Sequence, residues 1–269
     1  MKILFKKREV VKLIANKKNL GFVPTMGAIH IGHISLFKRS LSECDKTIVS
    51  IFINKPQFSK KRDYEKYPRS LKEDINKLKK LNIDYLYIPS HKEIYPHGIN
   101  KKIKINKFSK NLCGKYRPRH FESVVDVIDR FIKIINPLKI YFGEKDMQQL
   151  LLIKDFVKKK YKKIKILGCK TIRERSGIPY SSRNLLLSTK DKKIASNIFN
   201  FLFKRKKLII NKKIKINEIR DKIFSLGARK IDYIKIIDIN KIIRPYISKN
   251  KYKIFIAYYL NSIRLIDNF

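Results

Sequence analysis

Two histidines and two glycines lie close together in the segment Pro24–His33, which reads PTMGAIHIGH and follows an apolar stretch. Glycines between a strand and a helix let backbone N–H groups approach a phosphate, and the helix dipole favours its negative charge. His30 and His33 are three residues apart, so on a first helical turn both can donate hydrogen bonds to one ligand. The segment predicts a phosphate-binding turn, and on this motif alone an ordinary glycine turn with two surface histidines is an equal alternative.

Two amide side chains follow a second apolar stretch, in the segment Ser50–Phe58. Asn54 and Gln57 each offer hydrogen-bond donors and acceptors, which suits a ligand that carries hydroxyl and carboxylate groups. Their position directly after a predicted strand favours a place at the end of a sheet. The alternative for this segment taken alone is a polar loop without a ligand.

A second strand, glycine and helix sequence occurs at Tyr141–Gln149, which reads YFGEKDMQQ. Lys145 is a candidate partner for a phosphate, and Asp146 is a candidate for ribose hydroxyls or a hydrated Mg²⁺. Gln149 follows Asp146 by three residues and therefore lies on a neighbouring helical face. The alternative is a capped helix start whose charges are solvated.

Hydroxyl and guanidinium groups stand side by side in Tyr180–Asn184, which reads YSSRN. Ser181, Ser182 and Arg183 together suit the binding of a triphosphate by a loop. The alternative is a polar turn that precedes a helix, for which Ser188 is the predicted cap.

The elements that must position these motifs alternate between strands and helices. Apolar segments short enough for buried strands are Leu20–Val23, Thr47–Ile53, Tyr85–Ile88, Ile140–Phe142 and Ile164–Leu167. Between them, apolar residues at helical spacing predict helices over 71–81, over 124–135 and from about Met147 to Lys160. Ser70 and Glu73 predict a capping box for the first, and Asn136–Pro137 ends the second.

Alternating strands and helices predict an α/β fold with a Rossmann-like, doubly wound parallel sheet. Such sheets bind ligands at the carboxyl ends of their strands, where the motifs above stand. The last third differs: a helical stretch over 194–210 and a Lys-rich connector precede strand-like runs at 233–237, 254–260 and 263–266. The sequence therefore predicts a nucleotide- and substrate-binding domain over 1–175 and a smaller C-terminal α+β domain over 176–269 that covers the site.

Composition limits the class of protein. Hydrophobic residues make up 43% of the 269 residues, which is enough for sizeable cores, and no apolar run is long enough to cross a bilayer. The basic N-terminus lacks a signal-type apolar segment, so a cytoplasmic location is expected. Cys44, Cys113 and Cys169 are far apart without a CxxC pair, which predicts free thiols.

The net charge of +43, from 65 Lys and Arg against 22 Asp and Glu, raises the alternative of a nucleic-acid-binding protein. However, Lys, Ile and Asn are abundant together, as an AT-rich genome would produce, and the lysines are spread along the whole chain. We therefore expect no specific nucleic-acid partner and no membrane partner.

Six segments, taken in order, resemble the pantothenate synthetase family, the pantoate–β-alanine ligases. They are PTMGAIHIGH, SIFINKPQF, DYEKYPRS, RPRHF, YFGEKDMQQL and YSSRN. The ending RLIDN fits as well, so the resemblance extends over nearly the whole chain. The HxGH element is shared with a wider nucleotidyltransferase superfamily. That superfamily includes the class I aminoacyl-tRNA synthetases, which usually carry a KMSKS-like loop where Ser181–Arg183 stand here. The paired glutamines Gln57 and Gln149 are peculiar to the pantoate-using family.

The resemblance implies a ligase that activates pantoate with MgATP as pantoyl adenylate and joins it to β-alanine, with release of pyrophosphate and AMP. It implies that His33, His30 and Lys145 are catalytic, with His33 as the proton donor. It assigns Gln57 to pantoate and β-alanine and Gln149 to pantoate. Asn54, Arg117 and His120 are further substrate-pocket candidates, the last two at its edge. The implied ATP-binding residues are Met26, Gly27, Ala28, Ile29, His30, Ile31, Gly32, His33, Gly143, Glu144, Lys145, Asp146, Ile172, Tyr180, Ser181, Ser182 and Arg183.

The family is usually a homodimer, and the resemblance implies Mg²⁺ with ATP but no certain metal ligand from the protein. The sequence departs from the family pattern at Pro56, one place later than usual, and at Arg119 and Ser123, which replace glycines. Cys113 replaces an acidic residue, and Tyr180 stands where Met or Leu is common. Two other hypotheses are a different adenylyl-transferring enzyme of the same fold and a basic RNA-binding protein.

Overall fold

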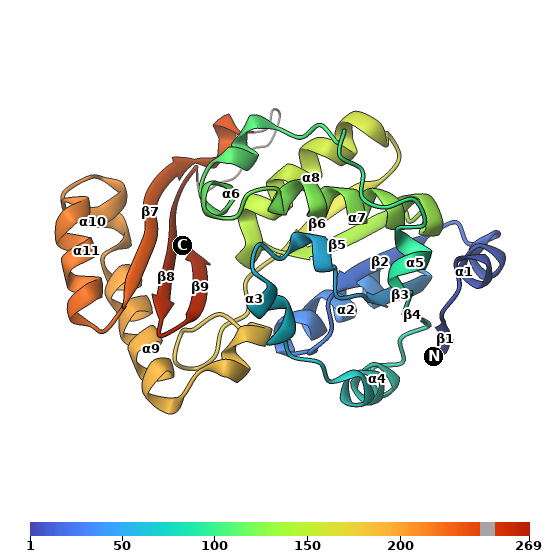
Figure 1. Cartoon of the computed structure of the whole chain (residues 1–269), viewed down its shortest axis with the longest axis horizontal. Coiled ribbons are helices and arrows are strands. Elements are labelled where there is room, and N and C mark those ends of the chain that lie inside the picture. The colour runs from blue at the N-terminus through green and yellow to red at the C-terminus, as the bar shows by residue number, and fades with distance from the viewer. Residues whose placement is uncertain (243–250) are drawn as a thin grey trace.

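The computed structural model describes residues 1–242 and 251–269 of the chain (Figure 1). These residues form a six-stranded parallel sheet and a three-stranded antiparallel sheet. Figure 1 places the large sheet and the N-terminus at one end of the molecule, and the small sheet with its helices at the other. The predicted fold class is therefore confirmed, whereas the predicted boundary between residues 175 and 176 stays a prediction.

The large sheet reverses its strand order beside β2. In spatial order its strands are β1 (Lys2–Leu4), β4 (Tyr85–Tyr87), β3 (Lys46–Ile51), β2 (Leu20–Thr25), β5 (Lys139–Gly143) and β6 (Lys165–Cys169). The chain runs outward from β2 through β3 to β4, and in the opposite direction from β5 to β6. The switch point therefore lies between β2 and β5, where a doubly wound sheet opens a crevice at its carboxyl edge. Strand β1 was not predicted, because only one of its three residues, Leu4, is buried, whereas all three residues of β4 are.

Helices cover both faces of the large sheet. One face packs against α1 (Lys7–Ile14), α7 (His120–Ile135) and α8 (Met147–Lys160), and the other against α2 (Ile31–Glu43) and α4 (Leu71–Lys80). Neighbouring strand residues face opposite cores, as Phe22 and Val23 do, so the strands are apolar throughout. The shorter elements are η1 (Lys55–Gln57), α3 (Lys61–Glu65), α5 (His91–Ile94), η2 (Lys107–Lys110), α6 (Cys113–Tyr116) and η3 (Glu144–Asp146).

The C-terminal part begins with η4 (Ser182–Leu186) and continues through α9 (Thr189–Lys204), α10 (Lys206–Ile210), α11 (Ile216–Ser225), β7 (Lys230–Asp238), η5 (Ile239–Lys241), β8 (Tyr252–Leu260) and β9 (Ile263–Asn268). The three late strands are confirmed. The predicted helix over 194–210 is two helices that break at Arg205, and the predicted connector contains α11. Ile216, Ile219 and Ile223 recur at helical spacing in α11, and the last two are fully buried.

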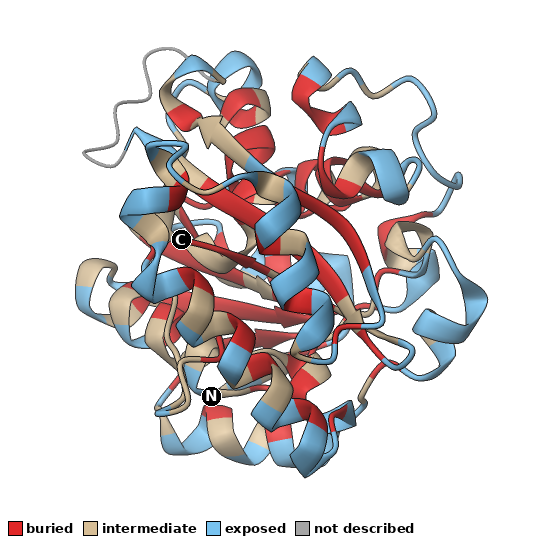
Figure 2. Ribbon diagram, turned by 90° about the vertical axis from the view of Figure 1, so that its left-hand side faces the viewer, coloured by how far each residue is buried: buried red, intermediate tan, exposed pale blue. Residues whose placement is uncertain are grey.

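Both faces of the small sheet are buried (Figure 2). On β8, Phe255 and Ala257 face the core shared with the large sheet, whereas Ile254, Ile256 and Tyr258 face α9–α11. Because strand residues alternate between faces, one strand links the two cores.

The two predicted caps have opposite outcomes. Ser188 caps α9 by accepting a hydrogen bond from Asp191 N at 3.1 Å. The capping box at Ser70 and Glu73 is wrong: Ser70 makes no cap bond, and its hydroxyl instead donates to Asp74 Oδ1 at 3.2 Å. Ser70 therefore bonds a buried carboxylate instead of the backbone N–H groups at the start of α4.

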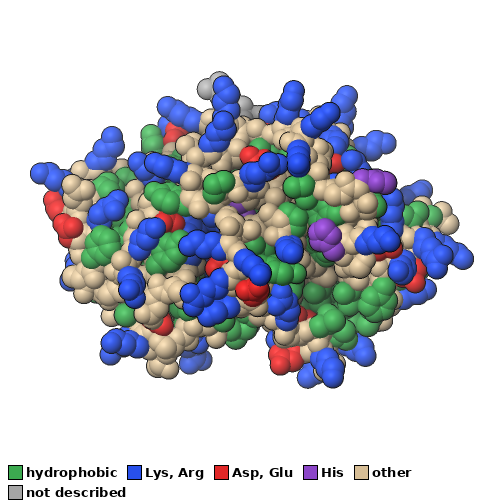
Figure 3. All heavy atoms as spheres, viewed as in Figure 1, with side chains coloured by type: hydrophobic (Ala, Val, Ile, Leu, Met, Phe, Trp, Pro, Cys, Tyr) green, Lys and Arg blue, Asp and Glu red, His purple; other side chains and the backbone are tan. Residues whose placement is uncertain are grey.

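Lysine and arginine side chains are scattered over the face in Figure 3 without forming a single basic patch. Cys44, Cys113 and Cys169 are free thiols, as predicted. Within the described ranges, no helix combines the length and the apolar character that crossing a bilayer requires.

Leu78→Ala should lower the free energy of unfolding by about 2–5 kcal/mol, because Leu78 on α4 is fully buried and its removal leaves a cavity. Leu185→Ala is the matched control, since Leu185 is 71% exposed and its truncation should change stability by less than about 0.5 kcal/mol. Urea titrations of both variants measure the difference, and equal losses would contradict the packing described for α4.

Candidate active site

The turn after β2 brings two histidine rings together at the carboxyl edge of the sheet. Gly27 and Ala28 have φ of +79° and +49°, and α2 begins at Ile31 directly after His30. The rings of His30 and His33 stack with centroids 3.9 Å apart and planes inclined by 25°. The two imidazoles therefore form one pair, as their spacing predicts.

Burial keeps both imidazoles neutral at pH 7. Burial, followed by the charge of Lys145, lowers the pKa of His30 to about 4. The pKa of His33 lies well below its ordinary value through burial and the neighbouring His30. A neutral imidazole carries a single N–H, and the buried Nδ1 atoms of both rings lack a partner among the described residues. This favours the tautomer with Nε2–H, which leaves each ring a donor for a ligand.

A carboxylate on α4 fixes the backbone of this turn. Asp74 is 1% exposed, and its two oxygens accept hydrogen bonds from Ala28 N at 2.8 Å and Ile29 N at 2.7 Å. Lys77 Nζ, one helical turn later, donates to Ile29 O at 2.9 Å. Asp74 and Lys77, both on α4, thus supply hydrogen-bond partners for backbone N–H and C=O groups of the turn that would otherwise have none. Sequence reasoning missed Asp74 and Lys77.

A chain of amides orients Gln57. Tyr95 donates its hydroxyl hydrogen to Asn54 Oδ1 at 2.8 Å, and Asn54 Nδ2 donates to Gln57 Oε1 at 3.1 Å. Gln57 Nε2 in turn contacts Met26 Sδ at 2.9 Å, next to the histidine turn. Asn54 is 1% exposed, so its contribution is to hold Gln57 in place.

The backbone of Gln57 is held from the other side by His120, the first residue of α7, and by Arg117 in the turn before it. The carbonyl oxygen of Gln57 lies 2.7 Å from His120 Nδ1 and 3.1 Å from Arg117 Nη2, and Arg117 Nη1 lies 3.1 Å from His120 Nε2. Burial and the charge of Arg117 hold the pKa of His120 well below its ordinary value, so the ring is neutral. The contacts assign Nδ1–H as the donor to Gln57 and Nε2 as the acceptor from Arg117.

Lys145 and Asp146 follow β5 on the other side of the switch point. Lys145 Nζ lies 3.7 Å from Asp146 Oδ1. Asn268 on β9 donates from Nδ2 to the carbonyl oxygens of Glu144 and Lys145, each at 2.9 Å. The small sheet therefore fixes the backbone that presents Lys145.

The serine and arginine segment packs directly on the histidine turn. Ser182 Oγ donates to Ala28 O at 3.2 Å, and the ring of Tyr180 stacks with His30 at 6.4 Å. Tyr180 N also donates to Ile172 O at 3.1 Å, which ties this segment to the strand end after β6. The segment thus closes one side of the site.

These four segments surround one cavity of about 220 Å³. Predicted residues on its wall are Met26, His30, Gly32, His33, Asn54, Gln57, Gly143, Lys145, Asp146, Gln149, Ile172, Tyr180, Ser181, Ser182 and Arg183. Apolar side chains of α7, Val124, Val127, Ile128 and Phe131, form the opposite wall. Tyr67, Lys170 and Thr171 also contribute and were not predicted. Tyr67 lies in the DYEKYPRS segment but was given no role, and Lys170 and Thr171 lie outside the recognised motifs.

The remaining predicted residues lie behind or beside the cavity. Gly27, Ala28 and Ile29 form the turn beneath its wall, and the side chains of Ala28 and Ile29 are buried in the core. Ile31 is 50% exposed on α2, and Glu144 contributes a carbonyl to the contact with Asn268. Arg117 and His120 line a neighbouring cavity instead.

The described residues contain no group of three or more His, Cys, Asp or Glu side chains that could hold a metal ion. Among the residues that the structure describes, Asp146 is the one carboxylate on the wall of the 220 Å³ cavity, and 47% of its side chain is exposed. One carboxylate together with phosphate oxygens is a usual environment for Mg²⁺, so the wall suits a metal that enters with a nucleotide.

Comparison with known proteins gives the same family over the whole chain. A family model described as pantoate–β-alanine ligase matches residues 2–269. The pantothenate synthetase of Ruthia magnifica is 40% identical, with 100% of this chain and 98% of that protein covered. That of Francisella tularensis subsp. novicida is 42% identical, with 95% and 91% covered.

Solved structures agree. The pantoate–β-alanine ligase of Francisella tularensis, described as complexed with beta-gamma ATP and β-alanine, has a TM-score of 0.85 at 38% identity, covering 100% of this chain and 97% of that one. The pantothenate synthetase of Thermus thermophilus has a TM-score of 0.88 at 29% identity, covering 100% and 99%. The chain therefore belongs to the pantoate–β-alanine ligase family, the pantothenate synthetases.

Proposed function

We propose that this protein condenses pantoate with β-alanine at the expense of ATP, and yields pantothenate, AMP and pyrophosphate. The observation that carries the proposal is that residues of four separate motifs line one cavity. Its wall combines the histidine pair, Lys145 and Ser181–Arg183 with the two glutamines that the family uses for pantoate. The membership of the whole chain in the ligase family supports the same reaction.

The two walls of the cavity suit the two ends of pantoate. Pantoate carries a carboxylate and two hydroxyls around a carbon with two methyl groups. Gln57 and Gln149 offer amide donors and acceptors to the polar groups. The methyl groups would pack against Val124, Val127 and Ile128 of α7, where burial of apolar surface is favourable.

In the first step, a carboxylate oxygen of pantoate attacks the α-phosphorus of ATP. The bond from that phosphorus to the bridging oxygen breaks, and pyrophosphate leaves with the electron pair. Lys145, Ser181 and Arg183 would hold the phosphates, and His30 and His33 would donate N–H hydrogen bonds to the charge that develops. Because both imidazoles are neutral, we assign to His33 the donation of a hydrogen bond and not the release of a proton from an imidazolium.

In the second step, the amine of β-alanine attacks the acyl carbon of the adenylate. AMP leaves with the electron pair, and the nitrogen gives up a proton. Gln57 would orient both pantoate and the amine, and its carbonyl is fixed by Arg117 and His120 for this task. No covalent bond to the enzyme forms, so positioning and charge stabilisation supply the rate.

A magnesium ion bound with ATP would be held by the phosphates and by Asp146, and would neutralise phosphate charge. We also propose, from the family resemblance, that the protein is a cytoplasmic homodimer. Neither the metal nor the dimer is needed for the residue roles assigned above.

Omission of single substrates tests the proposed reaction. With ATP, pantoate and β-alanine present, the protein should release AMP and pyrophosphate, and omission of β-alanine should limit the reaction to about one turnover of bound adenylate. Omission of pantoate should abolish both products. Release of AMP that is indifferent to pantoate or β-alanine would point to a different adenylyl-transferring enzyme.

His33→Ala should reduce adenylate formation by at least about a hundredfold, the usual effect of losing one transition-state donor. The substitution should leave the melting temperature close to that of the wild type. His97→Ala is the matched control, since His97 is exposed and outside the cavity. Near-normal turnover of His33→Ala in a rapid-quench assay would contradict the role of His33.

Asp74→Asn should lower adenylate formation by about ten- to a hundredfold, because an amide keeps one acceptor oxygen and releases one N–H of the histidine turn. Glu73→Gln makes the same charge change at the exposed neighbouring position and should keep full activity. Single-turnover rates at saturating ATP and pantoate measure both variants. Equal rates would show that the turn keeps its geometry without the carboxylate.

A further inference from the structure

The side-chain amide of Gln57 can face a ligand in two ways. Turned one way, it presents N–H donors to the cavity, and turned the other way it presents a carbonyl oxygen. The two ends of an amide have nearly the same size and shape, so packing alone does not choose between them. The choice decides whether the ligand atom bound there must accept or donate a hydrogen bond.

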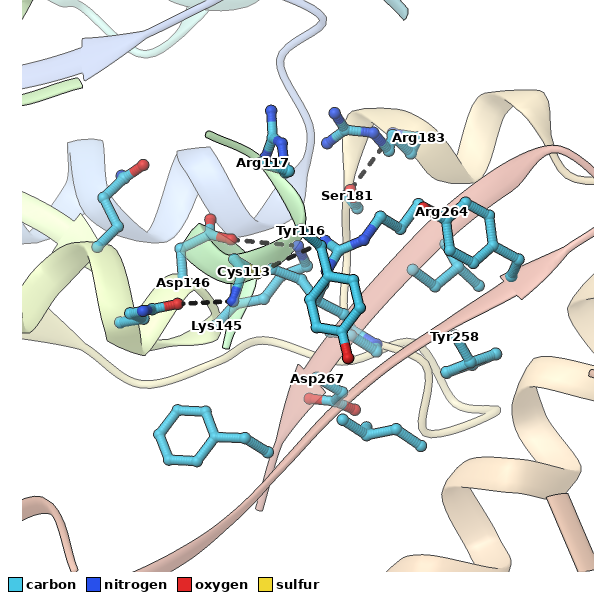
Figure 4. Close-up of a pocket in the computed structure, with 18 of the residues that line it drawn as sticks. Cys113, Tyr116, Arg117, Lys145, Asp146, Ser181, Arg183, Tyr258, Arg264 and Asp267 are labelled. Carbon is cyan, nitrogen blue, oxygen red and sulfur yellow. Dashed lines mark hydrogen bonds and ion pairs between the residues drawn. The ribbon is translucent and has the colours of Figure 1, made fainter. Parts of the chain in front are cut away.

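The contacts of the Gln57 backbone leave this choice open. Its carbonyl oxygen is held by Arg117 and His120. Figure 4 shows Arg117 among the residues that line the neighbouring cavity, to which Gln57 also contributes. These bonds fix the position of the backbone but not the torsions of the side chain. The orientation of the amide must therefore come from other groups.

A backbone carbonyl on α7 determines the orientation of the adjacent amide, that of Asn54. Ser123 O lies 3.2 Å from Asn54 Nδ2. A carbonyl oxygen can only accept, so the NH2 end of Asn54 must face it, and a reversed amide would set two acceptors against each other. Because Asn54 is 1% exposed, solvent does not compensate for a reversed amide.

Tyr95 holds the other end of the same amide. Its hydroxyl donates to Asn54 Oδ1 at 2.8 Å. Burial raises the pKa of Tyr95, so the hydroxyl keeps its proton throughout the physiological range. The ring is itself held in place, because the guanidinium of Arg130 lies 4.5 Å from its centroid and Arg130 donates to Ile94 O at 2.8 Å. Tyr95 lies on the wall of neither cavity.

The fixed amide of Asn54 in turn sets the direction of Gln57. Asn54 Nδ2 directs its second N–H at Gln57 Oε1, 3.1 Å away, and this contact requires the carbonyl end of Gln57. Gln57 Nε2 then points away from Asn54 and lies 2.9 Å from Met26 Sδ on the wall of the 220 Å³ cavity. A thioether is a weak acceptor and takes at most one of the two N–H groups, so a donor remains for the ligand.

We propose that Tyr95 is a positioning residue that, through Asn54, turns the N–H end of Gln57 toward pantoate. The side chain of Gln57 therefore selects a ligand oxygen that accepts a hydrogen bond, as the carboxylate and hydroxyl oxygens of pantoate do. The inference rests on the proposed function for the identity of this ligand. It assigns the selection to a hydroxyl that does not itself touch the substrate.

Tyr95→Phe tests the proposal, because it removes the hydroxyl and keeps the ring that packs with Arg130. The KM for pantoate should rise about three- to tenfold, since Asn54 loses a hydrogen bond and holds Gln57 less firmly. The kcat and the KM for ATP should stay within about twofold of the wild type, as expected for the loss of uniform binding of one substrate.

A double-mutant cycle separates positioning from a general loss of structure. In a Gln57→Ala background, Tyr95→Phe should have no further effect on the KM for pantoate, because the side chain that it positions is gone. An equal rise in both backgrounds would overturn the proposal, since damage that spreads through the fold does not depend on Gln57.

Tyr87→Phe is the matched control. Tyr87 on β4 is fully buried, its hydroxyl has no hydrogen-bond partner among the described residues, and it lines neither cavity. Its substitution should leave the KM for pantoate unchanged. A rise equal to that of Tyr95→Phe would show that the loss of any buried hydroxyl has this effect, and the proposal would fail.

A measurement without substrate keeps the proposal separate from the proposed function. In the free protein, a nuclear Overhauser effect should connect the side-chain NH2 of Gln57 with the methyl group of Met26. It should persist in Tyr87→Phe and be weaker in Tyr95→Phe, and equal strength in both variants would overturn the role of Tyr95. A wild type that forms no adenylate from pantoate would contradict the proposed function alone.

Discussion

The turn between β2 and α2 depends on one buried carboxylate. Two successive residues of this turn have positive φ, and the second is Ala28, which has a Cβ and gains nothing from this conformation. The N–H groups of Ala28 and Ile29 point away from water and would be costly if left unpaired. Asp74 accepts both, so α4 must dock against this turn before the histidine pair can have its geometry. The packing of α4 therefore determines the position of the two imidazole rings.

The same principle governs the rest of the site. Groups that carry the proposed chemistry are held through their backbone by residues that do not line the 220 Å³ cavity. Arg117 and His120 hold the carbonyl of Gln57, and Asn268 holds the carbonyl of Lys145. Side chains at the cavity are therefore free to bind substrate, because the groups around them supply the rigidity. Burial adds a second constraint, since it keeps His30 and His33 neutral and thereby makes them hydrogen-bond donors without charge.

Much of the large sheet and the composition of the cavity could be predicted from the sequence, because local patterns carry them. Strand β5 and helix α8 follow from an apolar run, a glycine and a helical period, and parallel strands bring their carboxyl ends to one edge. The role of Asp74 could not be predicted, because its partners lie 45 and 46 residues away and leave no local pattern. Helix α11 was not predicted, because the lysines before it made the segment resemble a connector, although Ile216, Ile219 and Ile223 stand at helical spacing.

The contact between Asn268 and the Glu144–Lys145 backbone spans 124 and 123 residues of the chain. Contacts of such long sequence separation form late in folding, after local helices and neighbouring strands. The histidine turn has a contact of similar reach, since Ser182 Oγ donates to Ala28 O across 154 residues. A chain in which β9 has not yet joined its sheet lacks the contact that fixes the backbone of Lys145.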